Sequence, residues 1–187
     1  MTTTVTRQEL PWIGELRNHI GLRETVGNRH NPTIQQWLRE MGGFPSARKS
    51  WWADDETPWC GLAVGHALGV SGRYVIPDWY RARSWADDAA MTRLDRPAYG
   101  AICIKARKGG GHVFFCVGQD KAGRILALGG NQGNAVSIVP FNAADIDGIY
   151  WPSKVASGGA AVKSVPHESR YNLPIGVATG APGASES

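Results

Sequence analysis

The sequence predicts an α+β domain, and two observations carry this prediction. Apolar residues recur at helical spacing in the first half of the chain, whereas short apolar runs bounded by Gly, Asn and Asp follow Pro97. Helices first and an antiparallel sheet second are typical of the α+β class.

Four helices are expected before Pro97. The first covers residues 11–18, and Asn31-Pro32 begins a second that Gly42-Gly43 ends. The third covers residues 58–68 and is apolar nearly all round, which predicts a place in the centre of the domain. Residues 79–90 are expected to form the fourth.

Five strands are expected after Pro97, with hairpin loops at residues 118–123 and 131–134. The predicted strands are 101–105, 112–117, 124–128, 135–139 and 148–151. The domain is expected to cover residues 11–152, after an N-terminal extension of residues 1–10. Residues 153–187 are rich in Ser, Gly, Ala and Pro and predict a flexible tail.

Composition narrows the classes of function. The 187 residues carry a net charge of +4, with no recognised nucleic-acid module. No apolar run approaches the roughly 20 residues of a membrane span, and no secretory leader is visible, so synthesis in the cytoplasm is expected. The three cysteines have no disulfide or zinc-knuckle spacing, and the five histidines are dispersed, so neither a metal nor a cofactor is expected.

Cys60 is the most reactive candidate in the sequence. Thr57 is a good N-cap and Pro58 suits the first helical position, which would put Cys60 at the third position of a helix. The unpaired N–H groups and the helix dipole there favour a thiolate, the nucleophilic form. His66 lies about 240° around the same helix from Cys60, so it is expected to be a structural histidine.

Three motifs together resemble the NlpC/P60 and CHAP groups of the papain-like superfamily. They are residues 55–60 (Asp-Glu-Thr-Pro-Trp-Cys), residues 110–113 (Gly-Gly-His-Val) and residues 128–132 (Leu-Gly-Gly-Asn-Gln). Within that superfamily the chain is most similar to single-domain peptidoglycan hydrolases of bacteriophages and prophages, over residues 11–152. The resemblance implies a papain-like fold, with the nucleophile helix packed on the C-terminal sheet.

The resemblance also implies a role for each site residue. Cys60 would be the nucleophile, His112 the general base and then acid, and Asn131 the residue that orients the imidazole, with Gln132 as its rival. The backbone N–H of Cys60 would contribute to an oxyanion hole. Substrate contacts are expected from Trp59, Asp54, Asp55 and Gln132. The acidic run before Cys60 departs from the family, which commonly has an oxyanion donor such as glutamine there.

The function expected from this resemblance is cleavage of amide bonds in bacterial peptidoglycan by a monomeric phage or prophage endolysin. Endopeptidase activity is favoured over N-acetylmuramoyl-L-alanine amidase activity. The alternatives are a secreted antibacterial effector with the same chemistry and a non-catalytic wall-binding or virion structural module. The enzyme would act in the periplasm after release from the cytoplasm, with holin-dependent release expected.

Overall fold

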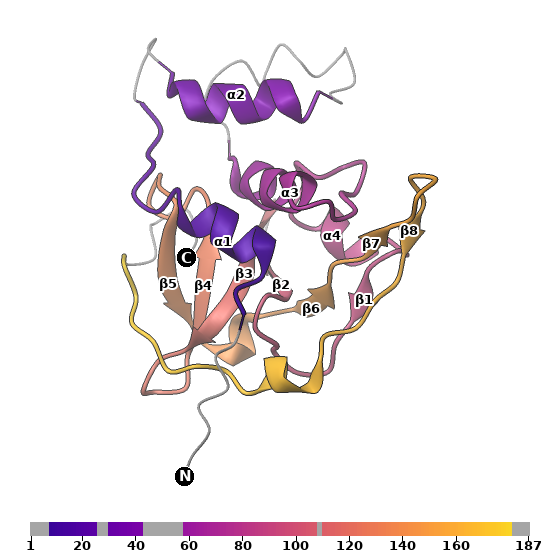
Figure 1. Cartoon of the computed structure of the whole chain (residues 1–187). Helices are drawn as coiled ribbons and strands as arrows, with labels where there is room; N and C mark the ends of the chain where they lie inside the picture. Colours follow the sequence, from indigo (N-terminus) through magenta and orange to yellow (C-terminus); the bar gives the residue numbers. More distant parts are fainter. Residues whose placement is uncertain (1–7, 26–29, 43–57, 108–109, 181–187) are drawn as a thin grey trace.

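The computed structural model describes residues 8–25, 30–42, 58–107 and 110–180, and they form an α+β fold (Figure 1). Helices come first in the chain and a six-stranded sheet follows, as the sequence predicts. The strand order is β1-β6-β2-β3-β4-β5, and all neighbouring strands are antiparallel. The strands of this sheet are β1 (Thr92–Arg93), β2 (Ile102–Arg107), β3 (Gly110–Gln119), β4 (Ile125–Gly129), β5 (Ser137–Phe141) and β6 (Gly148–Trp151).

The first two helices form where local signals place them. Helix α1 (Pro11–Arg17) starts on a proline and buries Trp12, Ile13 and Leu16. Helix α2 (Pro32–Glu40) is capped by Asn31, whose side chain accepts hydrogen bonds from two backbone N–H groups. No helix in the described part of the chain has the length and apolar character needed to span a bilayer.

Helix α3 (Cys60–Val70) begins later than the sequence predicts. Trp59 is its N-cap, without a side-chain capping bond, and Cys60 is its first residue rather than its third. The proposed cap, Thr57, lies outside the described residues. Nine consecutive α3 residues, from Cys60 to Leu68, are buried, which agrees with the predicted central position.

The predicted helix over residues 79–90 is wrong in extent. Only α4 (Ser84–Asp87) is helical there. The carbonyl of Trp79 accepts a hydrogen bond from the indole N–H of Trp85, at 3.0 Å. Burial of these two aromatic side chains therefore selects a series of turns over a continuous helix.

Successive side chains of β3 point to opposite faces of the sheet, and each face carries its own apolar cluster. Val113, Phe115 and Val117 belong to the main core, which includes the buried side chains of α1 and α3. Phe114 and Cys116 point the other way, into a smaller cluster with Phe141 and the β4 and β5 side chains. Figure 1 shows α1 and α3 over the same side of the sheet.

The five predicted strands are present: β6 has the predicted ends, and the ends of β2 to β5 are shifted by one or two residues. Strand β3 begins at Gly110, so His112 is its third residue and not its first. The two-residue strand β1 was not predicted; it pairs with β6.

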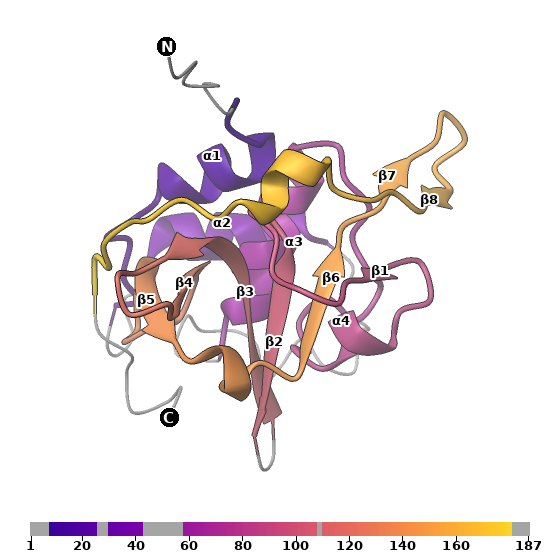
Figure 2. The ribbon, with the colours of Figure 1, turned by 90° about the horizontal axis from the view of Figure 1, so that it is seen from below.

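The described part of the expected tail carries regular structure. Strands β7 (Lys154–Val155) and β8 (Ala161–Val162) pair with each other, and a 3₁₀ helix covers Glu168–Tyr171. Figure 2 shows the segment after β8 running along the domain. It bonds to the sheet through Ile175, which pairs with Gln119, and through Thr179, whose hydroxyl accepts from the N–H of Ile138.

Candidate active site

The thiol of Cys60 sits at the start of α3, against strand β3. Cys60 is 4% exposed. Burial raises the pKa of the thiol above its ordinary value, while the backbone N–H groups of Val113 and Gly61 and the positive charge of Arg107 act in the opposite direction. The helix start thus favours thiolate as expected, but burial outweighs it, so the resting form is the neutral thiol.

Glycines allow the close approach of α3 to its neighbours. A Cβ atom on Gly61 would overlap the carbonyl oxygen of Trp79. A Cβ on Gly65 would come within 2.8 Å of the Met41 side chain. Glycine is required at position 61 because the Trp79 backbone occupies the space of a side chain.

His112 is held inside the fold from two directions. Its ring centroid lies 5.4 Å from that of Phe114 and 6.0 Å from that of Phe141. Its Nε2 lies 3.0 Å from Oε1 of Gln132. The ring is 3% exposed. This burial lowers the pKa of His112 to about 4, the bond to Gln132 opposes the shift, and the charges of Arg107 and Lys105 add to it.

The contacts of Gln132 determine the tautomer of His112. The Gln132 amide nitrogen donates to the carbonyl oxygens of Ser137, at 2.7 Å, and Ala127, at 3.2 Å. Its Oε1 is therefore the acceptor, and Nε2 of His112 must carry the proton that it accepts. The lone pair of the neutral imidazole is then on Nδ1, which is the nitrogen that can take a proton from a thiol.

Cys60 approaches β3 at the backbone N–H of Val113, whereas the imidazole of His112 lies beside Phe114 and Phe141, on the face of the strand that points away from the α3 core. The N–H group that lies against the thiol belongs to Val113, the residue after His112. Among the described residues, the hydrogen bond of the imidazole is made to Gln132, and the structure has none between thiol and imidazole. Proton transfer between the two groups would therefore require them to move together when substrate binds.

The residue that orients His112 is Gln132 and not Asn131. Asn131 has a φ of 58°, in the left-handed region, and this backbone turn brings the next side chain to His112. The loop after β4 packs closely against Trp59, and only glycine fits at position 130. A Cβ atom there would lie 2.5 Å from the Trp59 ring. The side chain that bonds the His112 imidazole is thus Gln132, the rival considered from the sequence, and not Asn131.

The described residues that were expected to contact substrate do not face solvent. Trp59 is fully buried and its indole N–H donates to Glu24 at 3.3 Å, so it supports the loop instead of facing solvent. Asp54 and Asp55 lie outside the described residues. Gln132 lines a cleft of about 170 Å³ together with Arg23, Gly133 and Ser137, but its own side chain is 2% exposed.

Two features of the structure were missed from the sequence. Arg107, at the end of β2, acts electrostatically on both Cys60 and His112, and only its membership of a small basic cluster could have indicated it. The second feature is a group of possible metal ligands, Glu15, His19 and His66, whose ligand atoms all lie within 4.8 Å of one another. Histidines that are dispersed in the sequence meet here because α1 packs on α3.

Comparison of the chain with protein-family models, with curated proteins and with solved structures gives no match.

Proposed function

We propose that this chain is a papain-like cysteine hydrolase that cleaves amide bonds of bacterial peptidoglycan. One observation carries the proposal most strongly. The thiol of Cys60 lies beside the strand that bears His112, and Gln132 holds this imidazole in the tautomer that can accept the thiol proton. An α+β fold with a helix bearing the thiol on an antiparallel sheet is consistent with the papain-like architecture.

The proposed reaction uses these groups in two steps. Nδ1 of His112 takes the thiol proton as the sulfur attacks the amide carbonyl carbon, and the resulting oxyanion accepts from N–H groups at the start of α3. The C–N bond then breaks, and the imidazolium gives its proton to the leaving amine. Water activated by the same imidazole cleaves the thioester, which releases the acid and restores the thiol.

The substrate class follows from the motif resemblance to NlpC/P60 and CHAP hydrolases. A cut within the stem peptide or cross-bridge is favoured over a cut between muramic acid and L-alanine, and a phage or prophage endolysin is the favoured source. Purified peptidoglycan should release soluble fragments when it is incubated with the full chain. Mass spectrometry of the fragments should locate the new amine within a peptide. A new amine on L-alanine, with free lactyl carboxylate, would assign an amidase instead.

A second candidate, a non-catalytic wall-binding module, is favoured by one observation. Cys60 is buried and its pKa is raised, which are features of a structural cysteine. Such a module would sediment with intact peptidoglycan and release no fragments at any enzyme concentration. Release of fragments that depends on Cys60 would exclude it.

A further inference from the structure

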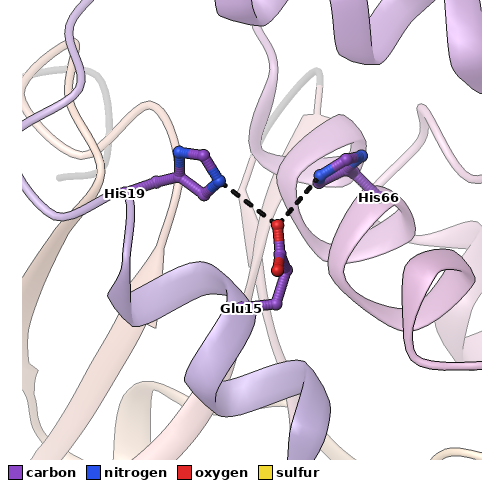
Figure 3. A group of neighbouring side chains, drawn as sticks. All are labelled: Glu15, His19 and His66. Atoms are coloured by element: carbon purple, nitrogen blue, oxygen red, sulfur yellow. Dashed lines mark hydrogen bonds and ion pairs between the residues drawn. The ribbon is translucent and has the colours of Figure 1, made fainter.

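A group of three side chains joins α1 to α3 away from the thiol. Glu15 lies in the last turn of α1, His19 is four residues later in the turn that follows the helix, and His66 is on α3, six residues after Cys60 (Figure 3). Oε1 of Glu15 lies 3.2 Å from Nε2 of His19 and 3.3 Å from Nε2 of His66. Figure 3 shows both imidazoles directed at this one oxygen.

A fourth side chain approaches His66 from the other side of its ring. Oε2 of Glu40, at the end of α2, lies 3.4 Å from Nδ1 of His66. Both ring nitrogens of His66 therefore face carboxylate oxygens. A neutral imidazole has one N–H only, so one carboxylate must face the nitrogen lone pair.

His66 is the most enclosed of these side chains. It is 7% exposed, against 27% for His19 and 30% for Glu15. In the neutral ring, a nitrogen lone pair that faces a carboxylate at this enclosed position is an unfavourable contact.

A cation held by Nε2 of His66 would remove this conflict. Nδ1 would then carry the proton and donate to Glu40, which is the arrangement of metal, histidine and second carboxylate that recurs in zinc proteins. The spacing of the ligand atoms also fits. Bonds of about 2.0–2.1 Å in a tetrahedron put the ligand atoms about 3.3–3.4 Å apart. Two of the three separations match this value, and the third, at most 4.8 Å, needs only a movement of the His19 ring.

We propose that Glu15, His19 and His66 form a Zn²⁺ site that fastens α1 to α3, with Glu40 as the positioning residue for His66. Two imidazoles and one carboxylate favour Zn²⁺ over the hard cations Mg²⁺ and Ca²⁺. The side chains of Glu15 and His19 are 30% and 27% exposed, so the ion can enter from solvent and a water can complete the tetrahedron. The ring of Trp37 stacks on that of His66, with centroids 4.6 Å apart, and forms an apolar wall.

The test is calorimetric titration of Zn²⁺ into the untagged full chain carrying Cys60→Ala, so that the thiol of the proposed active site cannot bind the ion. One Zn²⁺ per chain is expected. His19→Ala should weaken binding at least tenfold, and Glu40→Gln should weaken it about tenfold, the lower range for a partner of a metal-bound histidine. His167→Ala, a histidine outside the group, should bind as tightly as the parent.

Thermal unfolding gives an independent readout, because an ion that binds only the folded chain raises its melting temperature. Zn²⁺ should raise the melting temperature of the parent and not that of the His19→Ala variant. His19 is on the partly exposed side of the group, so this variant is expected to fold where His66→Ala would leave a buried gap. Absence of binding up to a millimolar concentration, or equal affinity in the parent and His19→Ala, would overturn the site.

Discussion

At the scale of single residues, the proposed chemistry depends on which nitrogen of His112 is protonated. Gln132 fixes this because its amide N–H groups are engaged by two backbone carbonyls, which leaves only its oxygen for the imidazole. The pKa of His112, lowered to about 4 by burial, keeps the ring neutral and able to act as a base over the physiological pH range.

Gln132→Ala should lower the rate of peptidoglycan cleavage by about 100-fold or more, since a misdirected imidazole loses most of a general-base contribution of about 10²–10⁴-fold. The imidazole would lose its preferred tautomer and direction. The measurement is the initial rate of amine release, with thermal unfolding to confirm that the variant is folded. Asn131→Gly is the matched control, since glycine tolerates the positive φ at this position. A larger loss in Asn131→Gly than in Gln132→Ala would contradict the assignment.

The pH dependence of stability should carry the signature of a buried neutral histidine. The folded pKa of His112 is about 4 against an ordinary 6.5, so the unfolded chain binds the proton more readily between these values. Stability therefore falls as the pH falls from about 6.5 to about 4, by on the order of 3 kcal/mol from this one group. Urea unfolding at pH 7, 5.5 and 4.5 should show a smaller loss in His112→Gln than in the unmodified chain. Equal losses would mean that His112 is not buried as a neutral group.

At the scale of elements, the position of the thiol is set by how closely α3 approaches the segment before α4. Gly61 faces the carbonyl of Trp79, and backbone cannot move aside as a flexible side chain can. Helix α3 therefore contains glycine at positions where alanine would form a more stable helix.

Gly61→Ala should destabilise the protein by about 3 kcal/mol or more, because overpacking against backbone forces the helix to shift. Gly69→Ala in the same helix should be neutral or stabilising by up to about 1 kcal/mol, since its nearest neighbour would be Cγ2 of Val75 at 3.6 Å. Chemical unfolding of the two variants measures the difference. Similar stabilities for both would show that α3 does not lie against Trp79 in this way.

Local signals account for the elements that were predicted correctly. Asn31 and Pro32 mark the start of α2 with their own side chains, and short, continuously buried apolar runs mark β2 to β5. The two residues of β1 are too few to show a period. The turns of residues 79–90 depend on the bond from the Trp85 indole to the Trp79 carbonyl, a tertiary contact that no local rule describes.

The sequence proposes residues for the site but does not determine its geometry. Cys60 and His112 are proposed from residue type, motif and order along the chain. The choice of Gln132 over Asn131 depends on a left-handed backbone turn, which the sequence permits but does not specify. The meeting of Glu15 and His66 depends on the packing of α1 on α3, so sequence spacing could not indicate it.

At the scale of the whole molecule, the C-terminal segment acts as a strap across the domain. Backbone of Arg170 accepts from the N–H of Tyr99, Ile175 pairs with Gln119, and Thr179 bonds to Ile138. Leu173 packs against both apolar clusters. The strap therefore joins loops and strands that are distant in sequence.

Deletion of residues 153–187 should lower the free energy of unfolding by several kcal/mol, since each lost hydrogen bond contributes about 0.5–1.5 kcal/mol and apolar cover is lost as well. A chain that ends at Gly180 retains all four contacts and is the control. Urea unfolding compares the two. Unchanged stability on deletion of the whole segment would mean that it does not strap the domain.

The central claim is that Cys60 is the nucleophile of an amide hydrolase. The most direct measurement is the initial rate of amine release from purified peptidoglycan by the unmodified chain, by Cys60→Ala and by Cys103→Ala, with all three shown to be folded. Cys103 is a buried thiol in the second apolar cluster and controls for loss of a cysteine as such. The account predicts that Cys60→Ala abolishes amine release and that Cys103→Ala retains it. Cleavage by Cys60→Ala at the unmodified rate would contradict the account.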